Sequence, residues 1–202
     1  MKTFVSLFMG LQLAVFTAHA AVPAAPAAVS TASEAGTAAL QQDLSEIARV
    51  ATIMIDGDVC QHIVTPRALQ HMLREDPRDE WQAGDNYDVN NDAFIQTKKT
   101  LIRLAMLAPY PVNVNLWMPV PTTPDIQLVI HNKYNLSQFS GTEGRMQQTM
   151  PPEMLQVLKT GKQVIYQKKP GMISVLAPVR NSLGEIVGLV EVVSSTLPPP
   201  PA

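Results

Sequence analysis

The chain contains 202 residues, of which 16% are charged, and carries a formal net charge of −2. This length allows one ordinary globular domain, and acids interspersed with bases exclude the clustered lysines and arginines that a nucleic-acid partner needs. The single cysteine excludes an internal disulfide.

Residues 1–20 have the pattern of a cleavable signal peptide. Lys2 precedes an apolar run over 4–16, and Ala18 and Ala20 stand at the two positions that a signal peptidase reads. A retained membrane anchor is the weaker alternative, because the run is shorter than the roughly 20 apolar residues of a spanning helix. The sequence therefore predicts a periplasmic or secreted protein whose mature chain begins at Ala21.

The segment 21–39 is rich in Ala and Pro and poor in bulky apolar residues, which predicts a disordered linker. A domain over 40–196 follows, with a helical part (40–110) and a sheet part (111–196). A Pro-rich tail at 197–202 comes after the domain. The first helix of the domain is indicated by apolar residues at spacings of three and four, namely Leu40, Leu44, Ile47, Ala51 and Ile55, and weakens at Gly57.

Two further helices are expected before the sheet. Thr65 and Pro66 start the first, with the hydroxyl as cap and the proline at the first helical position. Asn91 or Asp92 caps the second, whose apolar side comprises Phe94, Ile95, Leu101, Ile102, Ala105 and Met106.

A polar loop separates these two helices, and its acids invite a calcium-site interpretation. Asp85, Asp88 and Asp92 lack the loop glycine and the terminal glutamate of the helix-loop-helix calcium motif. A solvated loop is therefore the favoured interpretation.

The second half of the chain predicts strands. Apolar residues alternate with Asn113, Asn115 and Trp117 over 112–120, a turn follows at 121–125, and 126–132 returns as a second strand. A short helix opened by Pro151 and Pro152 ends at a glycine, and three strands follow at 164–167, 172–180 and 186–194. The order predicts an α+β fold, an antiparallel five-stranded sheet with N-terminal helices.

Both faces of the closing hairpin are apolar, so the sheet needs cover on both sides. Pairing across the Gly184 turn is expected to put Ala177, Leu189 and Glu191 on one face, and Leu176 and Val190 on the other. The long helices would cover one face and segment 141–161 the other, leaving a partly apolar cavity suited to a small ligand.

The run "GKQVIYQKKPGMISVLAPVRNSLGEIVGLVEVVSS", with "LWMPV" and "LVIHN" upstream, resembles a single Cache domain, the PAS-like extracellular sensor module of bacterial receptors. The resemblance covers about 113–195. It implies a small-molecule ligand in the pocket and a homodimer formed through the N-terminal helix. Members of the family usually lie between two membrane spans, whereas this chain has a cleavable signal and ends at a Pro-rich tail, so a separate membrane receptor partner is expected. The chain also lacks the aromatic and acidic motif of the amino-acid-binding members.

Candidate pocket residues are the polar or aromatic side chains on otherwise apolar strands: Trp117, His131, Tyr166, Arg180 and Glu191. His131 and Arg180 rank highest, because an organic acid would need donors of this type. An inward Glu191 would need a partner or a ligand, since a buried unpaired charge is costly. Each also has a purely structural interpretation. Trp117 would be a core residue, Arg180 a solvated residue next to a turn, and Glu191 an acid at a strand end.

Other functional classes have weaker support. Cys60, His62 and His71 offer ligands for a metal or haem, but Cys60 and His62 would point roughly 200° apart on a helix, and covalent haem attachment expects two cysteines. We expect no cofactor, and Cys60 is interpreted as a buried thiol before an intermolecular bridge or a reactive site. No hydrolase motif is present, so we expect no enzyme. The main alternative is a dimeric interaction or structural protein without a ligand.

Overall fold

The computed structural model describes residues 28–72, 89–131, 147–167 and 171–195. The expected signal peptide, the Pro-rich tail, and the loop acids Asp85 and Asp88 lie outside these residues. No helix within the described ranges is both long enough and apolar enough to cross a membrane.

Five helices and six strands are arranged in chain order as follows. The helices are α1 (Ala28–Met54), α2 (Gly57–Gln61), α3 (Pro66–Met72), α5 (Asn91–Ala105) and α6 (Pro152–Thr160) within the described residues. The strands are β1 (Asn113–Pro119), β2 (Asp125–His131), β3 (Gln147–Thr149), β4 (Val164–Tyr166), β5 (Met172–Arg180) and β6 (Ile186–Ser195). The α+β class expected from the sequence is confirmed.

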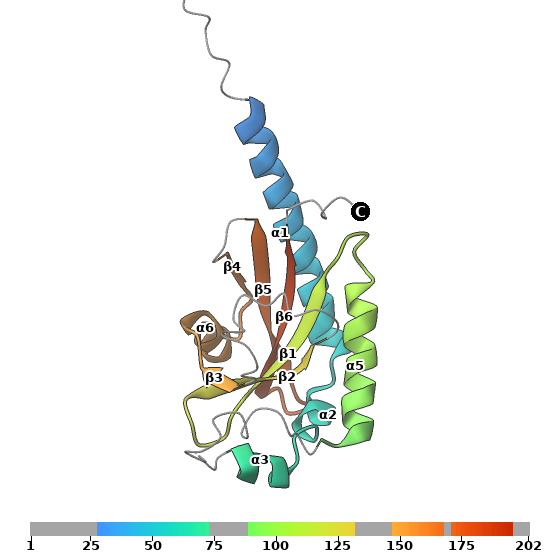
Figure 1. Cartoon of the computed structure of the whole chain (residues 1–202), viewed down its shortest axis with the longest axis vertical. Helices are drawn as coiled ribbons and strands as arrows, with labels where there is room; N and C mark the ends of the chain where they lie inside the picture. The colour runs from blue at the N-terminus through green and yellow to red at the C-terminus, as the bar shows by residue number, and fades with distance from the viewer. Residues whose placement is uncertain (1–27, 73–88, 132–146, 168–170, 196–202) are drawn as a thin grey trace, which may run out of the picture.

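Helix α1 starts earlier than the sequence indicated. The segment expected as a linker over 21–39 is helical from Ala28 onward, and in Figure 1 this first part of α1 extends beyond the upper edge of the sheet. The sequence of α1 contains no proline, since the last proline before it is Pro26, and it is rich in Ala, the strongest helix former. The low content of bulky residues therefore marks a helix that leaves the core, rather than a disordered chain.

The helix starts follow ordinary capping chemistry. The Ala68 amide donates to Thr65 Oγ1 at 3.2 Å, as expected for a cap in front of Pro66. Asn90, rather than Asn91 or Asp92, caps α5 by accepting from the Ala93 amide at 3.2 Å.

The apolar side predicted for α5 is partly wrong. Ile95, Ile102 and Met106 are exposed, and the helix instead buries Ala93, Thr97, Leu101 and Leu104. Ala93 and Thr97, the first two of these buried residues, have small side chains and lie on a helix that contacts α2. The buried side of α5 is therefore rotated from the side that hydrophobicity alone predicts.

The strands form one antiparallel sheet in the order β3-β2-β1-β6-β5-β4. Five of its strands match the predicted ones. The sixth, β3, is a three-residue edge strand that pairs with the start of β2. Its sequence, Gln-Gln-Thr, has no apolar alternation that would have predicted it.

The register of the closing hairpin differs by one residue from the expected one. Val179 pairs with Gly188 and Arg180 pairs with Ile186, so Val187 is an extra residue on β6. This bulge places Glu191 opposite Leu176 rather than on the face of Ala177. A one-residue shift exchanges the two faces of β5 relative to β6.

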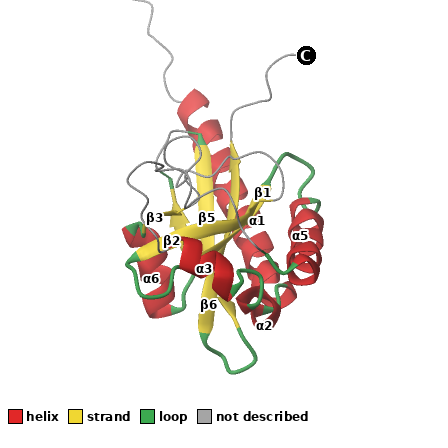
Figure 2. Ribbon diagram, turned by 60° about the horizontal axis from the view of Figure 1, so that its bottom comes forward, coloured by secondary structure: helices red, strands yellow, loops and turns green. Residues whose placement is uncertain are grey.

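Helices cover both faces of the sheet (Figures 1 and 2). Helix α1 packs against β5 and β6 on one face, with α5 and α2 beside it, and their buried side chains form the larger core. Helix α6 covers part of the other face, where Met154 and Val157 pack against Trp117, Leu176 and Leu189. The predicted need for cover on both faces is confirmed.

Helix α2 is fixed to the turn between β5 and β6. The Asp58 carboxylate accepts from the Ser182 amide at 3.0 Å and from the Ser182 hydroxyl at 3.2 Å. A Cβ atom at Gly57 would collide with the carbonyl oxygen of Arg180 and lie 2.7 Å from the Asn181 amide nitrogen. Gly57 is therefore required by the close approach of the two backbones.

We expect Gly57→Ala to destabilise the fold by about 1–3 kcal/mol, because rigid backbone atoms would have to move apart. Gly36→Ala is the matched control, since nothing lies within 4 Å of a Cβ atom at that position of α1; it should be neutral or stabilising by up to about 1 kcal/mol. Urea unfolding measures both, and equal effects would contradict the contact.

Candidate functional site

A buried carboxylate lies at the centre of the sheet on the face covered in part by α6. Glu191 of β6 is 0% exposed, although β6 is otherwise apolar around it. Its Oε2 accepts from Trp117 Nε1 at 2.9 Å and from Asn115 Nδ2 at 3.0 Å, and its Oε1 accepts from the Ser174 hydroxyl at 2.9 Å. We call Glu191, Asn115, Trp117 and Ser174 the Glu191 cluster.

The sheet order explains why these residues meet. Strand β6 lies between β1 and β5, so donors can reach Glu191 from both sides. Asn115 is its direct partner on β1, Trp117 is two residues further along that strand, and Ser174 is two residues from its partner on β5. Side chains two residues apart share a face, so the register brings all four together.

Two polar atoms in or next to this cluster have no hydrogen-bond partner among the described residues. They are Nδ2 of Asn113 and Oδ1 of Asn115, and the two residues are 3% and 0% exposed. Asn113 lies on the same face of β1, diagonal to Glu191. Buried amides normally find partners, because an unpaired polar group costs about 1–3 kcal/mol. The described residues therefore leave one buried donor and one buried acceptor unused beside Glu191.

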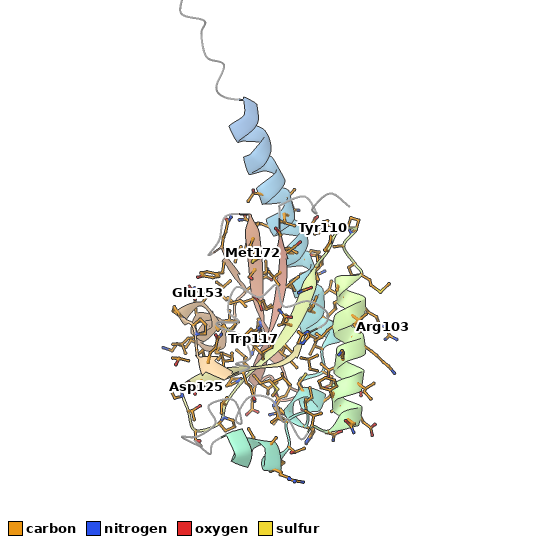
Figure 3. The ribbon with its side chains drawn as sticks, in the orientation of Figure 1. Arg103, Tyr110, Trp117, Asp125, Glu153 and Met172 are labelled. Carbon is orange, nitrogen blue, oxygen red and sulfur yellow. The ribbon has the colours of Figure 1, made fainter. Side chains whose placement is uncertain are left out.

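The same face divides into a polar and an apolar part. Trp117 stands between them: its indole nitrogen bonds Glu191, while it belongs to the apolar cluster under α6. Figure 3 shows Trp117 near the middle of the sheet, below Met172 of β5 and to the right of Glu153 on α6. The arrangement combines a few fixed polar groups with an apolar wall, which is typical of small-molecule sites.

Two further predicted residues lie at the edge of this face. His131 is exposed and is the β2 partner of Asn115, while Tyr166 is half-buried and is the β4 partner of Ser174. Partial burial, together with the Glu153 carboxylate, raises the pKa of Tyr166. The register therefore places Trp117, His131, Tyr166 and Glu191 on one face of the sheet, around its middle strands and their neighbours.

Arg180 lies at the hairpin end of the same face, beside Gly161 at the end of α6 and away from the Glu191 cluster. It is exposed at the end of β5, and its Nη1 donates to the carbonyl oxygen of Gly184 at 2.7 Å. The strand direction accounts for this position, because Arg180 lies four residues beyond the partner of Glu191 and next to the hairpin turn.

The sequence interpretation missed Asn113, Asn115 and Ser174. Their signal was present, since polar residues at alternate positions of an otherwise apolar strand mark one polar face. The asparagines were expected to face solvent on a half-buried strand, but β1 is the third of six strands and is covered on both faces.

Cys60 is a free, buried thiol 1% exposed in the core beneath α1. Burial raises its pKa to about 12, against a smaller opposite effect of a hydrogen bond with Thr97. His62 is exposed at the end of α2, and the His71 side chain lies outside what the structure describes. Among the described residues, no group of three His, Cys, Asp or Glu side chains is arranged to hold a metal ion.

Comparison with known proteins gives little further information. No family model matches the chain, and no curated protein matches it. A solved structure, the crystal structure of the A. Aeolicus nlh2 GAF domain in an inactive state, is similar over 79% of this chain and 83% of that chain, with 9% identity and a TM-score of 0.35. A likeness this distant says nothing of ligand or activity.

Trp117→Phe should destabilise the fold by about 1–3 kcal/mol, because it leaves a buried carboxylate oxygen with one donor fewer. Tyr110→Phe is the matched control: it removes the 3.1 Å hydrogen bond that the Tyr110 hydroxyl donates to Asp43 near the surface. Its cost should stay below about 1 kcal/mol. Chemical unfolding compares them, and an equal or smaller loss for Trp117→Phe would contradict the role of Glu191.

The Cys60 thiol should make stability fall at alkaline pH. Because its folded-state pKa of about 12 exceeds the unfolded value of about 8.5, the folded state keeps a proton that the unfolded state releases between these values. Stability is then fully present below about pH 8.5 and decreases by up to about 1.4 kcal/mol per pH unit above it. Urea unfolding across this range should show the slope in the wild type and a shallower one in Cys60→Ala; parallel profiles would contradict it.

Proposed function

We propose that this protein is a non-catalytic sensor domain of the Cache type that binds a small molecule beside the Glu191 cluster. The observation that supports this is the pair of unpaired amide atoms, on Asn113 and Asn115, next to a carboxylate that three side-chain donors hold in place. A purely structural network would be expected to pair its own amides.

The ligand that suits this site is polar and either uncharged or cationic. Among the described residues Glu191 forms no ion pair, so a ligand lying against it meets a negative charge. The organic acid expected from the sequence depended on donors from His131 and Arg180, and Arg180 lies at the hairpin turn instead. Asn113 Nδ2 can donate to the ligand and Asn115 Oδ1 can accept from it.

The proposal is non-catalytic because the most nucleophilic side-chain type in the chain is not available. The Cys60 thiol is buried and its raised pKa disfavours the thiolate. We propose that the Glu191 cluster binds rather than reacts: the Ser174 hydroxyl donates to the Glu191 carboxylate, and Asn115 and Trp117 hold the other oxygen of that carboxylate.

We further propose export to the periplasm or the exterior, and signalling through partner proteins. A homodimer through α1 is supported by the part of that helix that extends beyond the sheet and by Ile53 and Met54, which are 72% and 53% exposed at its other end. A short helix without a packing partner is marginal in water. A membrane receptor partner is proposed because a sensor outside the cytoplasm passes on its signal through a membrane-spanning protein.

The competing function is that of a ligand-free dimeric interaction protein. Exposed apolar residues on α1 and α5 favour it, and the unpaired amides of Asn113 and Asn115 favour ligand binding. The two functions separate in a binding experiment, because only the sensor needs an occupant at the Glu191 cluster.

The test is a thermal-shift screen of the full chain against amines, amino acids, polyols, organic acids, haem and divalent metals. A ligand at 100 times its dissociation constant adds about 2.7 kcal/mol to stability, which raises the melting temperature measurably. We expect an uncharged or cationic compound to produce this shift, and no shift across the panel would contradict ligand binding.

Two variants test whether the ligand binds beside the Glu191 cluster. Asn113→Leu should abolish the shift without lowering the melting temperature of the free protein, because it removes an unpaired buried donor. Arg180→Ala is the control and should keep the shift. A shift lost in Arg180→Ala and kept in Asn113→Leu would place the ligand at the hairpin turn instead.

A further inference from the structure

A groove lies on the opposite face of the sheet from Glu191, at the lower end that α1 leaves uncovered. Its volume is about 450 Å³, within the range of small-molecule sites, and apolar side chains such as Leu69, Met118 and Val187 form most of its wall. Figure 2 shows α3 in front of this end of the sheet. We call this cavity the α3 groove.

Gln127 of β2 is the distinctive polar residue of the α3 groove. The residue lines the groove although it is only 1% exposed, and its Oε1 has no hydrogen-bond partner. Its partners in the sheet are Met118 on β1 and Gln147 on β3, which place it on the face of α1 and away from the Glu191 cluster. Buried acceptors normally have a donor, so Gln127 Oε1 is a position at which a bound molecule could donate a hydrogen bond.

The charge of the groove indicates which donor fits. Glu185 lines it beside the hairpin turn, where its carboxylate accepts from Asn181 Nδ2 at 2.8 Å. The described residues that line the groove include no lysine or arginine. An ammonium group offers three donors and a positive charge, so it can satisfy an amide oxygen and lie close to a carboxylate.

We propose that the α3 groove binds a small organic amine, with the ammonium group directed at Gln127 Oε1 and the Glu185 carboxylate and the apolar body against Leu69, Met118 and Val187. This site is separate from the Glu191 cluster, because the two lie on opposite faces of the sheet. Its occupation does not depend on the function proposed above.

Titration of the ¹⁵N-labelled full chain with 2-phenylethylamine tests the site by NMR, with 2-phenylethanol as the probe that lacks the charge. The amine should give saturable shifts at Gln127, Val187 and Glu185, and the alcohol should bind at least about fivefold more weakly. A dissociation constant weaker than about 10 mM for the amine, or equal binding of the alcohol, would overturn the proposal.

Substitutions at Gln127 and Glu185 test whether these two side chains hold the amine. Gln127→Leu should lower amine affinity about tenfold without lowering the melting temperature, because an unpaired buried amide is replaced by an apolar side chain of similar size. Glu185→Gln should weaken binding up to about fivefold and keep the contact with Asn181. Unchanged affinity in Gln127→Leu, or a loss of stability in it, would refute the role of Gln127.

Two control variants locate the binding in the α3 groove. Glu153→Gln on α6 removes a carboxylate far from the groove and should leave amine affinity unchanged. Ser174→Ala in the Glu191 cluster should also leave amine binding intact, so failure of either site is distinguishable. Amine binding that is lost in Ser174→Ala and kept in Gln127→Leu would overturn the assignment to the α3 groove.

Discussion

The burial of the Glu191 carboxylate constrains the arrangement of the three central strands. A buried charge without hydrogen bonds is strongly unfavourable, and here the compensating donors come from β1 on one side and β5 on the other. A slip of either strand by one residue would turn Asn115 or Ser174 to the opposite face and leave the carboxylate short of donors. The hydrophobic pattern alone specifies this register weakly, because both faces of β5 and β6 are apolar. Glu191 therefore supplies register information that the valines around it do not.

The elements of the fold were predictable wherever local chemistry determines them. The cap at Thr65, the alternation along β1 and the five strands other than β3 follow from residue type and spacing. The pairing of β5 with β6 was not predictable, because apolar residues on both faces of these strands do not reveal the extra residue, Val187, that the bulge inserts. That single extra residue decided the face of Glu191 relative to its neighbours. The same limit applies to Arg180, whose distance from the Glu191 cluster follows from where the turn falls along the strand.

Composition misled in the first helix for a different reason. Low hydrophobicity over 21–39 excludes a packed core there, but it does not exclude a helix, because alanine needs no tertiary contact to favour helical backbone. Helix α1 joins two regimes: its second half is held by packing of Leu44, Ala48 and Ala51 beneath β5 and β6, and its first half continues that helix outward. Helix propagation costs less than nucleation, so a packed second half supports the first. The same element thus anchors the sheet and extends beyond its upper edge.

The Glu191 cluster and the α3 groove differ in what holds their polar groups, and this bears on how each is occupied. Glu191 is fixed by three bonds within one sheet, so its position hardly depends on a ligand. Gln127 belongs to β2, but the α3 groove is also lined by Leu69 of α3, so the groove depends on the docking of a seven-residue helix as well as on the sheet. A ligand shifts an equilibrium only by its differential affinity for two states, and short docked elements offer such states more readily than central strands do. The rigid Glu191 face is therefore suited to reading the shape and polarity of a ligand, and the α3 side is suited to responding to occupancy.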